Sequence, residues 1–296
     1  MRVLYSEGCH LFHEKVQGLG MVDDRLAEAA MVAEAADVVI ACVGLDATLE
    51  GEQGDTGNSF ASGDKMTLDL PESQQRMLNT LVKTGKPLVT VVAVGSALNV
   101  PQGDAQILAW YPGQAGGTAL AKILFGEVAP SGKLPLTFYH GVEELPEFTD
   151  YSMKERTYRY FTGKPLYPFG FGLSYTSFEV KDCAVDGGNG WVTATVANTG
   201  DMDGETVVQV YVRDTQSQWE TPNAHLAGFA RVQLAAGEEK QIAVKLDKNA
   251  FTVVNGEGER IADGKVFDLY CGLSQPDELS CELMGQSPVK MTVTFE

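Results

Sequence analysis

The sequence predicts an α/β domain with a mostly parallel sheet and helices on both faces, followed by an all-β sandwich. Up to about residue 138, apolar strand-like runs alternate with amphipathic helical patterns. That order is typical of a parallel sheet covered by helices. After about residue 176, short runs of alternating hydrophobicity follow one another with no helical pattern between them. Such a series indicates an antiparallel sandwich.

The first half begins with a short strand candidate at residues 2–5, followed by a helix that Asp23 and Asp24 open. Acidic side chains suit the positive end of a helix. Residues 37–44, DVVIACVG, form a continuous apolar run, which predicts a strand buried on both faces. Cys42 within this run is expected to be a small buried hydrophobic residue.

Pro71 begins the next predicted helix, and Gly85 is placed to end it as a C-terminal cap. Further strands are predicted at residues 87–95 and 105–111, and another helix at residues 114–126. The stretch that follows, residues 158–180, is dense in aromatic residues, Gly and Pro. We expect it to pack between the two domains, because a flexible linker would be more polar.

The second half carries several alternating runs bounded by Gly, Asn and Asp, as in domains of immunoglobulin or fibronectin type. In residues 205–214 the alternation predicts one face toward the core and the other toward solvent. The inward set is Val208, Val210 and Val212; the outward set is Gln209, Tyr211 and Arg213. We therefore expect domains at residues 1–175 and 176–296.

Composition limits the classes of function. The net charge of −18 and the pI near 4.6 argue against a nucleic-acid partner and against anionic membranes. No apolar run is long enough to cross a bilayer. Five scattered cysteines fit free thiols, and the N-terminus lacks a signal-peptide pattern. These features predict a cytoplasmic protein, or a secreted one if a natural N-terminus with a signal peptide is missing. Neither a metal site nor a cofactor is expected.

Several motifs together identify a family. They are GLDATLEGE (residues 44–52), WYPGQAGG (110–117), GEVAPSGKLP (126–135) and YPFGFGLSY (167–175). With them, the chain resembles the C-terminal half of a glycoside hydrolase family 3 enzyme, of the exo-β-glucosidase and β-xylosidase type. Residues 226–246 resemble part of the fibronectin type III-like domain that follows in many members.

The resemblance implies that one of the two catalytic carboxyl groups lies outside this sequence. Family members typically begin with a (β/α)8 barrel that supplies an aspartate nucleophile, and the α/β sandwich lends the acid/base. This sequence matches the sandwich without its start and has no barrel. We therefore expect it to carry half an active site, to be inactive alone, and to need a barrel domain or subunit. The implied substrate is a neutral β-linked glucoside or xyloside.

The carboxylates between residues 50 and 64 are the candidate catalysts. Retaining glycoside hydrolysis needs two carboxyl groups about 5–5.5 Å apart. By resemblance, Glu52 is our choice for the acid/base, with Glu50 as the alternative. Residues 51–55 match the family pattern, although Gln53 precedes Gly54 where the family has the reverse order. Thr56 also stands where the family commonly has Arg.

Other residues are candidates for substrate binding. Asp64 and Lys65 occupy the place of a Gly-Asp-Arg motif in the family, where they either anchor the loop or contact sugar. Trp219 is expected in an exposed loop of the sandwich, where its ring could stack on a sugar. Trp110 and Tyr111 are expected chiefly to close the edge of the sheet.

Two other functions stay open. The chain could be a non-catalytic carbohydrate-binding or interaction module, or one subunit of a split enzyme. A binding module would take up a saccharide without any partner, whereas half of an active site would bind it weakly. Nothing in the sequence distinguishes glucose from xylose, which differ by one hydroxymethyl group.

Overall fold

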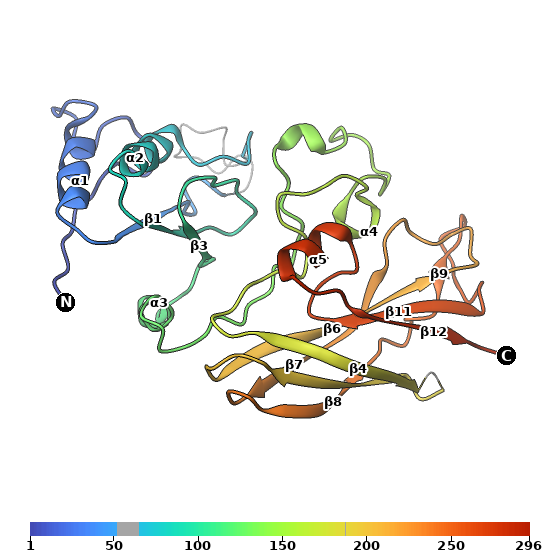
Figure 1. The fold of residues 1–296 in the computed structure, drawn as a ribbon. Coiled ribbons are helices and arrows are strands. Elements are labelled where there is room, and N and C mark those ends of the chain that lie inside the picture. Colours follow the sequence, from blue (N-terminus) through green and yellow to red (C-terminus); the bar gives the residue numbers. More distant parts are fainter. Residues whose placement is uncertain (52–64, 187) are drawn as a thin grey trace. The chain divides into compact units, whose positions relative to one another are not determined.

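The computed structural model describes residues 1–51, 65–186 and 188–296 (Figure 1). The chain forms two compact units. The first comprises residues 1–120 and 139–144, and the second comprises residues 121–138 and 145–296. Residues 145–175 thus pack with the sandwich. The predicted domain boundary between residues 175 and 176 stays a prediction.

The first unit is an α/β unit built on three parallel strands. Its elements are α1 (Asp24–Glu34), β1 (Val39–Gly44), α2 (Glu72–Val82), β2 (Leu88–Ala93), β3 (Ala105–Leu108) and the 3-10 helix η2 (Val142–Glu144); α3 (Gly116–Leu124) begins in this unit and ends in the next. The strand order is β1-β2-β3, with Val39 paired to Leu88 and Val89 paired to Ala105. Residues 2–5 form no strand, contrary to the prediction.

The core of this unit lies between the sheet and the pair of helices α1 and α2. Ala41 and Val43 of β1 are buried in the same cluster as Ala33 of α1 and Leu78 of α2. The alternation along β1 turns Ile40 and Cys42 to the opposite face, where both are exposed. The expected burial of Cys42 is therefore wrong, because the described chain leaves this face of β1 uncovered.

The end of β1 is fixed by a glycine and a buried amide. Gly44 has a φ of 147°, and a Cβ on it would lie 1.8 Å from the Ala93 carbonyl oxygen. Gln74 of α2 bonds both sides of the same residue: its Oε1 accepts from Gly44 N at 2.8 Å and its Nε2 donates to Gly44 O at 2.7 Å. The chain therefore leaves β1 in one fixed direction.

The second unit is an antiparallel sandwich with a short helix. Its elements are α4 (Thr157–Tyr160), β4 (Phe178–Asp186), β5 (Trp191–Asn198), β6 (Gly204–Asp214), β7 (His225–Leu234), β8 (Glu239–Lys245), β9 (Val253–Val254), β10 (Arg260–Ile261), β11 (Val266–Gly272), α5 (Glu278–Met284) and β12 (Val289–Thr294). One sheet has the order β12-β11-β6-β7 and the other β4-β5-β8. A parallel α/β sheet followed by an antiparallel sandwich confirms the predicted fold class. Helix α5, between β11 and β12, was not predicted.

Strand β6 is buried on both faces along much of its length. Val208, Val210 and Val212 face the core as predicted, each with no exposed surface. Gln209 and Tyr211 were expected to face solvent, but both are buried. The segment before β4 covers this outer face: Gln209 Nε2 donates to Gly170 O at 3.0 Å, and the Tyr211 hydroxyl donates to Gln209 Oε1 at 2.6 Å.

Candidate active site

The candidate site lies where the parallel strands end at their carboxyl edge. After β1, the chain makes a turn in which the Asp46 carbonyl oxygen accepts from Leu49 N at 3.0 Å and from Glu50 N at 2.9 Å. Leu49 is buried in the core of the unit and so anchors the turn. Ligands of open α/β sheets bind outside this edge. Glu50 therefore stands at the position where such a fold places its functional groups.

The Glu50 carboxylate is surrounded by hydrogen-bond donors. Its Oε2 accepts from Gly95 N at 2.7 Å and from the Tyr111 hydroxyl at 2.6 Å. Its Oε1 accepts from the Ser96 hydroxyl and lies 3.4 Å from Lys65 Nζ. The Glu50 side chain is only 15% exposed. The carboxylate is thus held in place by groups that follow β2 and β3.

These donors decide the protonation state of Glu50. Burial is the largest influence and would raise the pKa of the carboxyl group, but the bonds from Ser96, Tyr111 and Gly95, together with the Lys65 charge, lower the pKa below its usual value. The pKa of the Tyr111 hydroxyl is raised, first by burial and then by its bond to Glu50. These bonds therefore favour the ionised form of the Glu50 carboxyl group.

Lys65 closes the cluster from the other end of the intervening segment. Its Nζ donates to the Ser96 hydroxyl and to the Ala97 carbonyl oxygen at 3.2 Å, besides pairing with Glu50. Burial lowers the pKa of Lys65, and the Glu50 charge counteracts that effect. With its donors directed to these three partners, Lys65 serves as an anchor in this structure.

The cluster depends on two unusual backbone positions. A Cβ on Gly95 would lie 2.9 Å from the Tyr111 ring and 3.0 Å from Glu50 Oε2, so only glycine lets these side chains approach. Trp110 has a φ of 54°, in the left-handed region that non-glycine residues seldom adopt. This turn directs the following residue, Tyr111, toward Glu50.

The structure describes some of the predicted site residues and not others. Glu50 and Lys65 lie together, whereas Glu52 and Asp64 fall outside the described residues. Trp219 belongs to the second unit, where its ring lies against Gly256, and 41% of the residue is exposed. Its contact with sugar stays a prediction.

Sequence reasoning missed the roles of Gly95, Ser96 and Tyr111. Tyr111 was expected chiefly to close the sheet edge, and it also donates a hydrogen bond to Glu50. A signal was present, because Gly95 and Tyr111 end predicted parallel strands and Ser96 follows one of them. The carboxyl ends of such strands meet at one edge.

The described part of the chain shows no cluster of His, Cys, Asp or Glu side chains that could hold a metal ion. Among the same residues, no helix is long and apolar enough to cross a membrane.

Both halves of the chain match models of known protein domains. Residues 7–175 match the model of the glycosyl hydrolase family 3 C-terminal domain, and residues 206–275 match that of the fibronectin type III-like domain. A xylan 1,4-beta-xylosidase of Xylanibacter ruminicola is 41% identical over 251 residues, which is 81% of this chain and 29% of that protein. A periplasmic beta-glucosidase of Salmonella typhimurium is 32% identical over 307 residues, covering 92% of this chain and 39% of that protein.

The solved structures agree with these matches. A family 3 beta-glucosidase of Bifidobacterium adolescentis matches 96% of this chain with a TM-score of 0.79 and 31% identity. A beta-glucosidase of Listeria innocua, solved with gluconolactone, matches 95% of this chain with a TM-score of 0.72 and 25% identity. The match covers 42% of the first structure and 39% of the second. The chain thus spans well under half the length of these proteins.

Proposed function

This chain belongs to glycoside hydrolase family 3, and on that basis we propose that it carries the general acid/base of a retaining exo-β-glycosidase. The observation that supports the proposal most is the joining of Glu50 and Lys65 through Ser96. Glu50 and Lys65 flank the segment that contains Glu52, and their contact through Ser96 holds both flanks at the carboxyl edge of the sheet. This is the edge where α/β folds bind ligands.

In this proposal, Glu52 protonates the departing glycosidic oxygen and later removes a proton from the attacking water. A carboxylate of a (β/α)8 barrel outside the printed sequence attacks the anomeric carbon and forms the glycosyl-enzyme. The barrel either precedes this sequence in a longer polypeptide or belongs to a separate subunit. The acid must hold its proton near neutral pH. The lowered pKa of Glu50 argues against that residue as the proton donor.

The substrate that we infer is a terminal β-linked xylosyl or glucosyl residue. The support is that the two relatives are named as a xylan 1,4-beta-xylosidase and a beta-glucosidase. A neutral sugar also suits a chain with a net charge of −18, because an anionic ligand would be repelled.

The test uses the enzyme that contains both this chain and the barrel. With xylobiose and cellobiose, whose departing sugar alkoxide needs a proton, Glu52→Gln should lower kcat/KM by about 10²–10⁴. On aryl β-xyloside and β-glucoside, the smaller Glu52→Ala variant should regain turnover with azide, which attacks the glycosyl-enzyme without needing a base. The matched control is Glu50→Ala, which should gain nothing from azide because Glu50 is not the proton donor.

Two results would contradict the proposal. One is azide rescue of Glu50→Ala and not of Glu52→Ala, which would assign the acid/base to Glu50. The other is turnover by the 296-residue chain alone that Glu52→Gln abolishes, since such a chain would need no barrel. We expect the chain alone to show no turnover.

A further inference from the structure

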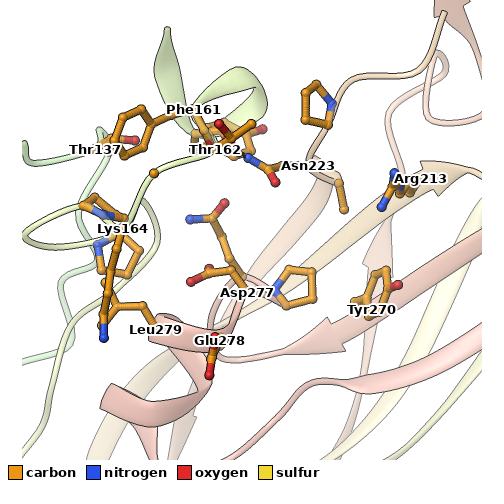
Figure 2. A pocket seen from close by; sticks show the side chains of 18 residues that line it. Thr137, Phe161, Thr162, Lys164, Arg213, Asn223, Tyr270, Asp277, Glu278 and Leu279 are labelled. Atoms are coloured by element: carbon orange, nitrogen blue, oxygen red, sulfur yellow. Dashed lines mark hydrogen bonds between the residues drawn. The ribbon is translucent and has the colours of Figure 1, made fainter. Parts of the chain in front are cut away.

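A pocket of about 390 Å³ lies within the second unit, on the outer face of the sheet that contains β6 and β11. Figure 2 shows Arg213 and Tyr270, from these two strands, on one side of the hollow, with Lys164 and Leu279 on the opposite side. Its size falls within the range of pockets that hold small organic ligands. Its lining residues all belong to the second unit, whereas the Glu50 cluster belongs to the first.

The walls of the pocket are largely fixed before any ligand arrives. Four of the lining residues are prolines: Pro165, Pro168, Pro222 and Pro276. The fixed φ of proline restricts the backbone on several sides. Asn223 ties two parts of the wall together, because its Nδ2 donates to Tyr158 O and to Phe161 O, each at 2.8 Å. A preformed pocket loses little conformational entropy on binding.

Several polar groups of the pocket have unused bonding capacity. Gln275 is only 6% exposed; its Nε2 donates to Phe169 O at 3.0 Å, and no described residue donates to its Oε1. The Asn223 Oδ1 likewise accepts nothing from the described chain. Arg213 is exposed, and its side chain makes no hydrogen bond or ion pair with any described residue, although its charge helps to lower the pKa of Asp268 opposite it on β11. The pocket therefore offers two acceptors and a guanidinium group with no hydrogen-bond partner among the described residues.

This set of groups matches a polyhydroxylated ligand. Each hydroxyl group both donates and accepts a hydrogen bond, and Arg213, Asn223 and Gln275 supply both kinds of partner. The rings of Tyr158, Phe161 and Tyr270 add apolar surface for the C–H faces of a sugar ring. The charged lining residues cancel, two positive (Lys164 and Arg213) against two negative (Asp277 and Glu278), which favours an uncharged ligand.

We propose that this pocket, whose lining lies entirely within the second unit, binds a neutral saccharide of one or two pyranose units. The proposal stands on the geometry of the second unit alone. It holds whether or not Glu52 is the acid/base, and the experiment can be done without the barrel.

The test is calorimetric titration of the full chain with xylobiose and with cellobiose. We expect saturable binding of at least one of them, weakened about tenfold or more by Arg213→Ala and by Tyr270→Ala. The matched control is Arg231→Ala. Arg231 lies on β7 of the same sheet, pairs with Glu205 and does not line the pocket, so its loss should leave the affinity unchanged.

A further variant and a further ligand distinguish this pocket from the catalytic site and from an anion-binding site. Glu52→Gln should leave the affinity unchanged; an affinity that falls in Glu52→Gln and persists in Arg213→Ala would overturn the proposal. Selective binding of D-glucuronate over both disaccharides would also overturn it, because the ligand would then be anionic. So would the absence of binding at millimolar concentrations. Thermal unfolding checks each variant, and if Tyr270→Ala fails to fold, the exposed Arg213 decides the outcome.

Discussion

Replacing Glu50 by Gln tests whether the cluster stabilises the first unit through an ionised carboxylate. Gln keeps the shape and one acceptor oxygen. If that oxygen faces Gly95 and Tyr111, the new amide group faces Ser96 and Lys65. The Ser96 hydroxyl can rotate to accept from this amide, but the Lys65 ammonium group cannot accept a hydrogen bond from it and loses its anion.

The expected loss is the net value of one hydrogen bond to a charged group, about 2 kcal/mol at neutral pH. Both partners of this pair are largely buried, with side-chain exposures of 15% for Glu50 and 19% for Lys65, so solvent screening removes little of it. A loss of this size corresponds to a fall in Tm of roughly 5 °C.

The loss should depend on pH in a defined direction. The pKa of Glu50 is lower in the folded protein than in the unfolded chain. Its stabilisation is therefore complete above the unfolded pKa, about 4.3, and disappears as the pH falls through the folded value. The difference in Tm between wild type and Glu50→Gln should be greatest at neutral pH and should shrink in increasingly acidic buffers.

Thermal unfolding followed by circular dichroism measures this difference across the pH range. The matched control is Glu34→Gln, at an exposed residue of α1 whose side chain makes no hydrogen bond or ion pair with the described chain, which should change Tm little. Equal Tm values for wild type and Glu50→Gln at neutral pH would refute the reasoning. So would a difference that stays constant into strongly acidic buffer, since it could not come from the ionised carboxylate.

Two further changes test the surroundings of the cluster. Tyr111→Phe removes one hydrogen-bond donor to Glu50 and should lower the free energy of unfolding by about 1 kcal/mol. Because the pKa of Glu50 then rises, acid unfolding should move to higher pH. An unchanged acid midpoint would contradict this. Gly44→Ala places a Cβ 1.8 Å from the Ala93 carbonyl oxygen at a φ of 147°, so denaturant unfolding should show a loss of more than about 4 kcal/mol or no folded protein. The control is Gly117→Ala in α3, where the added Cβ meets no atom within 4 Å and the change should be neutral or slightly stabilising. Similar stability of the two alanine variants would show that the close approach at Gly44 does not constrain the fold.

The alternation of apolar and polar residues predicted burial correctly on the face of a strand that packs in the core of its own sandwich. The alternation in β6 correctly turned Val208, Val210 and Val212 toward the core. It failed for Gln209 and Tyr211, because a segment more than thirty residues earlier covers the outer face. Gly170 O of that segment accepts from Gln209, and the Tyr211 hydroxyl in turn donates to Gln209. A period of two reports which face a residue lies on, but not what covers that face.

The candidate site was predictable in part for a related reason. The resemblance directed attention to the segment between Glu50 and Lys65, and the ion pair between these two residues lies there. The donors Gly95, Ser96 and Tyr111 come from turns after other strands. Their convergence depends on the parallel pairing of β1, β2 and β3, a long-range property that no motif in the sequence records. The lowered pKa of Glu50 follows from that convergence, so the sequence alone could not predict it.

Because Ser96 bonds to both Glu50 and Lys65, the sheet fixes the two ends of the stretch between them independently of its length. Lengthening a connection whose two ends are held together costs little, about 0.6 kcal/mol for each doubling. Insertions, deletions or exchange of whole stretches at this position should therefore leave the rest of the fold intact.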